Sequence, residues 1–268
     1  GEVVACEVAG PLGDCVSARM LVDGEYESAV IEMAEAAGIG YSPCTEPAAL
    51  AATTYGVGEL MLRAVRAGAK TIYIGLGGSA TNDGGAGMLQ ALGARVVDDQ
   101  GCDVAPGLAG LEHVSSIDLT SALRALSGVR IVVLSDVENP LVGRRGALAV
   151  FGGQKGLLAG DAEVLCRYDS WMVGYGRLLD AAITGVRAQG LLRVPEGVRV
   201  CYFSRKEALA EGACLVDGTL VLRSGGEEVP LVTVDELGIK GPHNVENALA
   251  ACALAYFAGC DPEKMREV

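Results

Sequence analysis

The stretch TIYIGLGGSATNDGGAGMLQAL, residues 71–92, decides the fold of this chain because it predicts a strand, a glycine-rich polar loop and a helix in succession. Residues 71–76 form the β-branched and aromatic run of a buried strand, and Met88, Leu89 and Leu92 recur at helical spacing. The same alternation continues outward, with a helical pattern over residues 119–126 before a strand pattern over residues 129–134. It favours an α/β fold, a mixed or parallel sheet with flanking helices.

The loop inside this stretch predicts an anion-binding site. Its glycines permit positive φ and close backbone approach, so amide groups at the start of the following helix can point at a phosphate or carboxylate. Glycine also serves packing in strand-to-helix turns that bind nothing, but four polar side chains between the glycine pairs favour a ligand. The glycines are Gly77, Gly78, Gly84 and Gly85, and the polar residues are Ser79, Thr81, Asn82 and Asp83. No Gly-Lys-Ser/Thr ending follows, so the loop is not a Walker A motif and needs a cation from elsewhere.

Several other elements are predicted by pattern. Asp23-Gly24 predicts a two-residue hairpin turn, and Thr53 or Thr54 is available to cap a helix that Gly68 ends. An aromatic stripe in a long helix over residues 161–184 indicates core packing. The predicted strands are residues 3–8, 16–22, 94–97 and 198–203, with 213–216 and 219–223 joined at Asp217-Gly218, and a helix follows at 244–257.

The segment GLGGSATNDGGAGM, followed by QALG, resembles the signature of the bacterial glycerate kinases, which phosphorylate D-glycerate with ATP. Further blocks resemble that family in the same order, and an ordered series is more specific than one loop. They are Gly10-Pro-Leu-Gly-Asp14, IEMAEAAG at 31–38, Thr53-Thr-Tyr-Gly56, DVENPL at 136–141 and Gln154-Lys-Gly156. The resemblance covers about residues 1–185 and lacks the family's amino-terminal and carboxy-terminal portions.

The resemblance implies direct phosphoryl transfer from Mg-ATP, in which positioning and charge neutralisation matter most. Three residues are the expected catalytic set. Asp83 would act as a base or hydroxyl-positioning carboxylate, Asp136 would hold Mg²⁺ or the substrate, and Lys155 would bring an ammonium to a phosphate. The expected substrate- and phosphate-binding residues are Gly77, Gly78, Ser79, Thr81, Asn82, Gly84, Asn139 and Gln154.

Plain structural roles stay open for some of these residues. Asp136 follows a predicted buried strand, where ligands bind in open α/β sheets, but Asp136 and Asn139 equally suit turn hydrogen bonds before Pro140. Lys155 follows a flexible Phe-Gly-Gly segment and equally suits a solvated surface.

The end of the chain, about residues 195–268, resembles a different family. VCYFS at 200–204 and GPHNVENALAA at 241–251 resemble the end of the central ATPase domain of the Mur ligases, above all the enzyme that adds D-glutamate to UDP-N-acetylmuramoyl-alanine. That family's phosphate loop and last domain do not appear. The resemblance implies adenine contacts for Asn244 and Asn247, and helix capping is the alternative. We expect a kinase-like domain over 1–188 and a smaller Mur-like α/β piece with a β-hairpin over 189–268.

Composition limits the partners. The chain has 268 residues and a formal net charge of −13, which argues against nucleic acid and anionic membranes. Nine cysteines without Cys-x-x-Cys spacing argue against a disulfide framework, and two histidines without ligand spacing argue against a zinc site. No apolar run reaches about 18 residues. We expect a cytoplasmic protein that binds a small molecule; the oligomeric state is left open.

Three functions follow, in order of preference. The first is an ATP-dependent glycerate kinase acting on D-glycerate. The second is a catalytically incomplete binding or structural module, or a fusion fragment, because both resemblances are partial. The last is a Mur-type amide ligase, which the missing phosphate loop disfavours.

Overall fold

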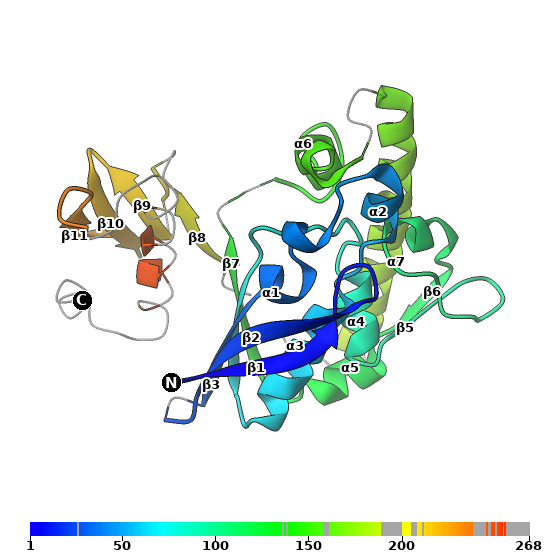
Figure 1. The fold of residues 1–268 in the computed structure, drawn as a ribbon, viewed down its shortest axis with the longest axis horizontal. Coiled ribbons are helices and arrows are strands. Elements are labelled where there is room, and N and C mark those ends of the chain that lie inside the picture. The colour runs from blue at the N-terminus through cyan, green and yellow to red at the C-terminus, as the bar shows by residue number, and fades with distance from the viewer. Residues whose placement is uncertain are drawn as a thin grey trace. The chain divides into compact units, whose positions relative to one another are not determined.

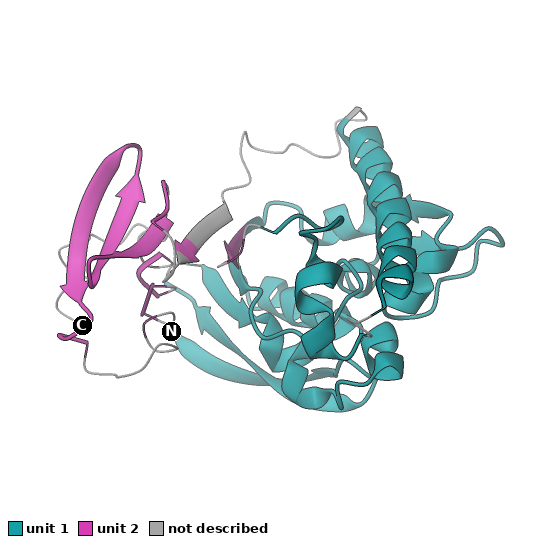
Figure 2. Ribbon diagram, turned by 90° about the horizontal axis from the view of Figure 1, so that it is seen from above, with its two compact units in different colours: residues 1–131, 139–197 teal, residues 132–138, 198–268 magenta. Residues whose placement is uncertain are grey.

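The computed structural model describes most of the chain. Its described residues are 1–25, 27–135, 137, 139–157, 161–188, 200–204, 208–210, 212–237, 245, 248–249, 251–253 and 255. They form two compact units, coloured separately in Figure 2. Unit 1 holds residues 1–131 and 139–197, and unit 2 holds residues 132–138 and 198–268. The division into a kinase-like domain ending at residue 188 and a following fragment stays a prediction.

The sheet of unit 1 is mixed, as expected. Its strands lie in the order β1, β2, β3 and β4, with β1–β2 and β2–β3 antiparallel and β3–β4 parallel. Figure 1 shows the long β1–β2 hairpin, which carries the start of the chain. The strands are β1 Glu2–Ala9, β2 Cys15–Asp23, β3 Ser28–Glu32 and β4 Thr71–Gly75.

The helices pack into two apolar cores, of which the first lies against this sheet. Helix α3 buries Val57, Leu60 and Met61 at helical spacing against Ile31 and Ile72 of the sheet. Helix α7 contributes its apolar face to a second core, which confirms the packing role of the aromatic stripe. The helices are α1 Met33–Ala37, α2 Glu46–Ala51, α3 Tyr55–Arg66, α4 Ala86–Ala91, α5 Thr120–Ala125, α6 Ala147–Phe151 and α7 Ala162–Ala188, with 3-10 turns η1 Ile39–Tyr41, η2 Leu108–His113 and η3 Gly153–Lys155.

The short strands β5 Arg95–Val97 and β6 Ser116–Asp118 pair with each other outside the main sheet. The strand predicted over residues 94–97 is therefore present. Its partner is a neighbouring strand of only three residues, which the sequence pattern did not reveal.

Unit 2 combines parallel and antiparallel strands. The end of β7 Arg130–Ser135 pairs in parallel with β8 Val200–Ser204, and β8 pairs in parallel with β9 Gly212–Val216. Strands β9, β10 Thr219–Ser224 and β11 Glu227–Thr233 form an antiparallel meander. This confirms a smaller sheet with a β-hairpin towards the end of the chain.

The two Asp-Gly turns have different outcomes. Asp217 and Gly218 adopt φ of 47° and 79°, so the predicted two-residue turn between β9 and β10 is present. At Asp23-Gly24 the predicted hairpin is present, since β2 and β3 pair antiparallel, but the predicted two-residue turn is wrong, because Asp23 itself pairs with Ser28. The carbonyl of Glu27 accepts the amides of Lys70 and Thr71, so contacts with the start of β4 help to fix this connection.

Candidate active site

The signature loop borders a cavity of about 190 Å³ within unit 1. The loop joins β4 to α4, and the other walls come from α6, η3 and α7. Polar groups of the loop and one lysine therefore line a cavity whose other lining side chains are mainly apolar. The lining residues are Met33, Thr54, Leu76, Ser79, Thr81, Asn82, Asp83, Gly84, Gly85, Leu141, Ala147, Leu148, Lys155 and Met172.

Lys155 reaches the signature loop from η3, across 76 residues of sequence. Its Nζ donates hydrogen bonds to Ser79 Oγ at 3.0 Å and to the Thr81 carbonyl at 2.6 Å. Burial lowers the pKa of Lys155 to about 8, while the nearby Asp83 carboxylate opposes that shift. The cation that the loop lacks in its own sequence is thus supplied by tertiary structure.

Glycine is required beside this lysine. Gly156 has a φ of 107°, and a Cβ there would lie 2.4 Å from the backbone carbon of Cys44. The turn that ends η3 therefore packs directly against the segment before α2. That close approach fixes where the side chain of Lys155 begins.

Asp83 is a buried acceptor at the centre of the loop, with 1% of its surface exposed. Its Oδ2 accepts the amide and hydroxyl of Thr54, both at 2.8 Å, and the amide of Gly87 at 3.1 Å. A longer contact of 3.4 Å comes from Thr53 Oγ1, and Oδ1 accepts the Gly85 amide at 3.1 Å. Four donors therefore surround Oδ2, whereas Oδ1 accepts one bond and keeps an acceptor position. The geometry supports organisation of the loop more strongly than proton transfer.

The loop amides divide into two groups. Those at the start of α4 are consumed: Gly85 and Gly87 donate to Asp83, and Met88 donates to Thr54 Oγ1 at 2.9 Å. The expected anion site at the helix start is therefore wrong, because the loop's own carboxylate occupies those donors. By contrast, the amides of Gly77, Gly78, Ser79 and Thr81 donate to no residue that the structure describes.

The free amides lie in and beside the cavity. Gly77 and Gly78 are exposed and do not line it, whereas Ser79, half-buried beside the ammonium of Lys155, and the buried Thr81 do. An antiparallel bridge between Gly38 and Ser79 anchors this half of the loop, with Ala80 donating to the Ala37 carbonyl at 2.8 Å. Backbone donors and an ammonium together suit a carboxylate or phosphate.

The remaining predicted residues fall into three groups. Asn82 lines the cavity and donates to the Ala49 carbonyl at 3.2 Å, and Gly84 lies against Met172 and Tyr175. Asn139 donates to the Arg145 carbonyl at 2.9 Å, a turn contact, and Gln154 is exposed and does not line the cavity. Asp136, Asn244 and Asn247 lie outside the described residues.

Two polar residues of the site were not predicted. Thr53 or Thr54 was expected to cap α3, and Thr53 Oγ1 accepts the amide of Tyr55, the first residue of that helix, at 3.2 Å. Thr54 occupies the N-cap position, but its side chain makes no cap bond and instead joins Asp83 to the Met88 amide. Tyr175 of α7 is fully buried, and its hydroxyl donates to the Gly84 carbonyl at 3.4 Å. Burial, with a smaller contribution from Asp83, raises the pKa of Tyr175, which therefore stays protonated. Thr53 and Thr54 stand out in the sequence as a pair, but the sequence does not show that both contact Asp83.

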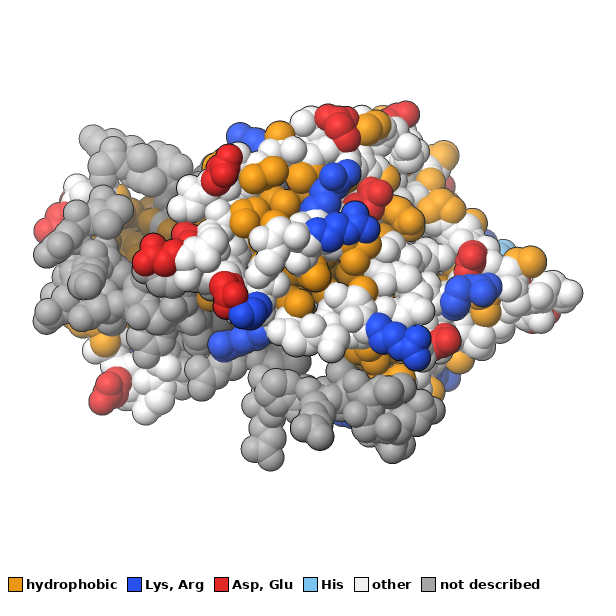
Figure 3. All heavy atoms as spheres, turned by 90° about the horizontal axis from the view of Figure 1, so that it is seen from below, with side chains coloured by type: hydrophobic (Ala, Val, Ile, Leu, Met, Phe, Trp, Pro, Cys, Tyr) orange, Lys and Arg blue, Asp and Glu red, His pale blue; other side chains and the backbone are white. Residues whose placement is uncertain are grey.

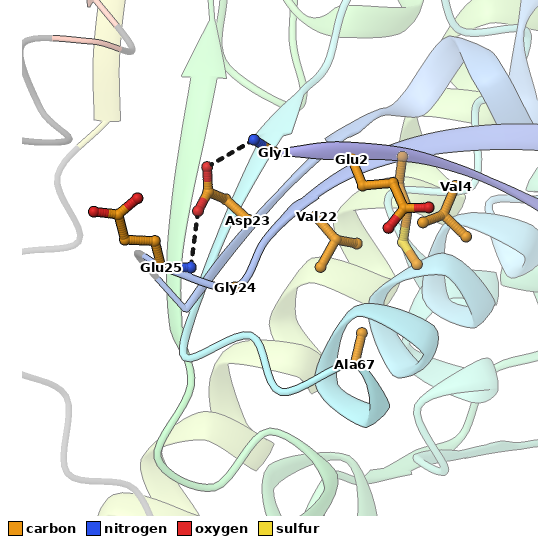
Figure 4. Close-up of a pocket in the computed structure, with 9 residues that line it drawn as sticks. Gly1, Glu2, Val4, Val22, Asp23, Gly24, Glu25 and Ala67 are labelled. Carbon is orange, nitrogen blue, oxygen red and sulfur yellow. Dashed lines mark hydrogen bonds and ion pairs between the residues drawn. The ribbon is translucent and has the colours of Figure 1, made fainter.

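A larger cavity of about 590 Å³ lies at the β1–β2 hairpin. Figure 4 shows Glu2, Asp23 and Glu25 around it, and the amino terminus of Gly1 is paired with Asp23 at 3.2 Å. No lysine or arginine lines it. Its carboxylates repel anions, so the smaller cavity at the signature loop is the better candidate site for an acidic substrate.

Among the described residues there is no group of three or more His, Cys, Asp or Glu side chains that could hold a metal ion. Oδ2 of Asp83 is occupied by protein donors, as described above. The free loop amides and Lys155 fit an anionic group, such as a phosphate of ATP or the carboxylate of a substrate.

Known proteins match the part of the chain that carries this site. A sequence model of the Glycerate kinase family matches residues 1–190. The chain belongs to the glycerate kinase family. The predicted resemblance of this part of the sequence is thereby confirmed.

Individual glycerate kinases are similar over the same part. The Glycerate kinase of Bacillus subtilis (strain 168) is 47% identical over 165 residues, which are 62% of this chain and 43% of that protein. The Glycerate 2-kinase of Escherichia coli (strain K12) is 42% identical over 176 residues, or 66% of this chain and 45% of that protein. A solved structure described as a glycerate kinase 2 from Salmonella typhimurium LT2 superposes with a TM-score of 0.65 at 47% identity, covering 69% of this chain and 48% of that one.

This glycerate kinase family member spans about half the length of the curated relatives that it matches. The comparisons do not support the expected Mur ligase resemblance of residues 195–268, which stays a prediction. Within the described part of the chain, no helix has the length and apolar character needed to cross a bilayer.

Proposed function

We propose that this chain carries the substrate site of an ATP-dependent glycerate kinase, which transfers a phosphoryl group from ATP to a hydroxyl of D-glycerate. The observation that carries the proposal is the Lys155 ammonium bonded to Ser79 Oγ and the Thr81 carbonyl beside free loop amides. Family membership and the names of the relatives support it.

The size and charge of the cavity favour the acid over the nucleotide as its occupant. A volume of about 190 Å³ lies below the roughly 300–1,000 Å³ of pockets for drug-sized ligands. Lys155 is the cation among the described lining residues. The amides of Gly77, Gly78 and Ser79 would bind the carboxylate of D-glycerate together with Lys155, and the exposed glycines leave a side open for an incoming phosphate.

Asp83 would act as a positioning residue in this scheme. Its buried carboxylate ties the start of α4 to Thr54, while the Gly38–Ser79 bridge anchors the half with the free amides, so the loop would be aligned before the ligand arrives. Such preorganisation favours charge neutralisation in phosphoryl transfer. Mg²⁺ would neutralise phosphate charge when bound with ATP, and Asp136 keeps its proposed role as its ligand or as a substrate contact. We also propose a cytoplasmic location, where ATP is available.

A coupled ADP-release assay with D-glycerate tests the proposal, with Lys155→Met as the matched variant. The account expects ADP formation that depends on D-glycerate and falls at least about a hundredfold in the variant, because an anion-binding charge is lost. Calorimetry with D-glycerate runs in parallel. Binding without ADP formation would support the incomplete binding module instead. Absence of both binding and turnover in the wild-type chain would refute the proposed site.

A further inference from the structure

Thr54 connects the starts of two helices through one hydroxyl group. It precedes α3, and its Oγ1 donates to Asp83 Oδ2 at 2.8 Å while accepting the Met88 amide of α4 at 2.9 Å. Its own amide also donates to Asp83 Oδ2 at 2.8 Å. Thr54 is 2% exposed, so these bonds are shielded from water.

The two helices beside this hydroxyl pack closely. A Cβ at Gly87 would clash with Thr53 Oγ1 and lie 3.0 Å from Asp83 Oδ2. A Cβ at Gly58 would lie 2.5 Å from the Met88 carbonyl, so α3 and α4 touch through backbone. This close packing holds the partners of the Thr54 hydroxyl, Asp83 and Met88, near the start of α3.

Asp83 links Thr54 to the ligand-facing half of the loop through the backbone. It lies two residues after Thr81, whose carbonyl accepts the Lys155 ammonium at 2.6 Å. We therefore expect a shift of Asp83 to displace that carbonyl and the neighbouring free amides. Thr54 lines the cavity, but the one proton of its hydroxyl is donated to Asp83 Oδ2, so this group has no proton left to donate to a ligand.

We propose that Thr54 is a positioning residue, which sets the ligand-binding half of the signature loop through Asp83. The inference rests on the proposed function, because the loop is taken to bind D-glycerate. It assigns the role to the hydroxyl of Thr54, not to the methyl group or to the neighbouring Thr53. Thr53 contacts Asp83 Oδ2 only at 3.4 Å.

Three variants of the full chain separate these possibilities. Thr54→Val removes the hydroxyl at nearly constant shape, Thr54→Ser keeps it, and Thr53→Val is the matched control one residue away. Each is measured for kcat, for the KM of D-glycerate and ATP, and for hydrogen exchange of the peptide over residues 77–89. We expect Thr54→Val to raise the KM of D-glycerate about tenfold and to speed exchange in this peptide, as for a lost buried hydrogen bond. Thr54→Ser should restore both quantities, and Thr53→Val should change them less than Thr54→Val.

The outcomes distinguish this inference from the proposed function. A residue needed only for folding would lower the active fraction, and so kcat, with both KM values unchanged; that result would overturn the inference. So would a Thr54→Ser protein that folds but behaves like Thr54→Val. If the wild-type chain makes no ADP, the proposed function fails, and unchanged hydrogen exchange in Thr54→Val would then overturn the positioning role independently. If Thr54→Val does not fold, wild type and Thr54→Ser are compared instead. A Thr54→Ser protein that folds but has a raised KM for D-glycerate and faster hydrogen exchange over residues 77–89 would overturn the inference.

Discussion

At the scale of single residues, Lys155 shows how burial adjusts an anion site. Its ammonium is partly desolvated between Ser79 Oγ and the Thr81 carbonyl, and its pKa falls to about 8. The Asp83 carboxylate opposes this fall in the pKa of Lys155. Burial, helped by Asp83, raises the pKa of Tyr175, so the Tyr175 hydroxyl stays protonated while Lys155 titrates. The site therefore carries its positive charge at neutral pH and loses it in mildly alkaline solution.

This titration predicts a pH dependence for ligand binding. Below about pH 8 Lys155 is charged and attracts the carboxylate, and above it the neutral amine does not, so affinity for D-glycerate should fall as pH rises. Loss of one proton can lower the affinity for D-glycerate by at most about tenfold per pH unit. Calorimetric titrations between pH 7 and pH 9.5 measure the effect. Lys155→Met should bind weakly with a flat profile in this range, whereas a wild-type affinity that rises with pH would contradict the account.

At the scale of elements, the contact between α3 and α4 predicts opposite effects for two glycine substitutions. Gly58→Ala would press a Cβ against the Met88 carbonyl at 2.5 Å, and overpacking of this kind costs about 1–3 kcal/mol. Gly174→Ala lies in α7 with nothing within 4 Å of the new Cβ, so it should stabilise the chain by roughly 0.5–1 kcal/mol. Urea unfolding monitored by circular dichroism gives both values. Equal effects at the two sites would refute the packing argument.

The elements also show which structure the sequence could predict. The strand, loop and helix of the signature stretch and the Asp217-Gly218 hairpin follow from local propensity, and both are present. The turn at Asp23-Gly24 and the partners of Thr54 depend on contacts with β4 and α4, so no local pattern reveals them. Lys155 was connected with the site because it follows a flexible Phe-Gly-Gly segment and because the family resemblance favoured a functional role. Its bond to Ser79 spans 76 residues, a separation at which spacing carries no information.

At the scale of the whole molecule, the proposed site would bind an anion against the charge of the chain. The formal net charge is −13, and Figure 3 shows acidic and basic side chains interspersed on one face of the described residues. Local donors would therefore have to overcome a general repulsion. Residues 1–190, which match the family, contain the described cavity.

The net charge predicts an unusual salt dependence. Screening weakens long-range repulsion between exposed charges more than it weakens the partly buried attraction of Lys155. The association rate of D-glycerate should therefore rise, by roughly twofold, when monovalent salt increases from about 10 mM to 150 mM. Stopped-flow measurement of binding tests this. A rate that falls with salt would indicate that a basic surface, and not the shielded lysine, attracts the ligand.

The central claim is that the amides of Gly77, Gly78 and Ser79 and the ammonium of Lys155 form one anion site. Two-dimensional amide NMR of the ¹⁵N-labelled chain during titration with D-glycerate tests it most directly. The account predicts saturable shifts concentrated at residues 77–81, which disappear in Lys155→Met while the rest of the spectrum is retained. Shifts concentrated elsewhere, or shifts at residues 77–81 that persist without the lysine, would contradict it.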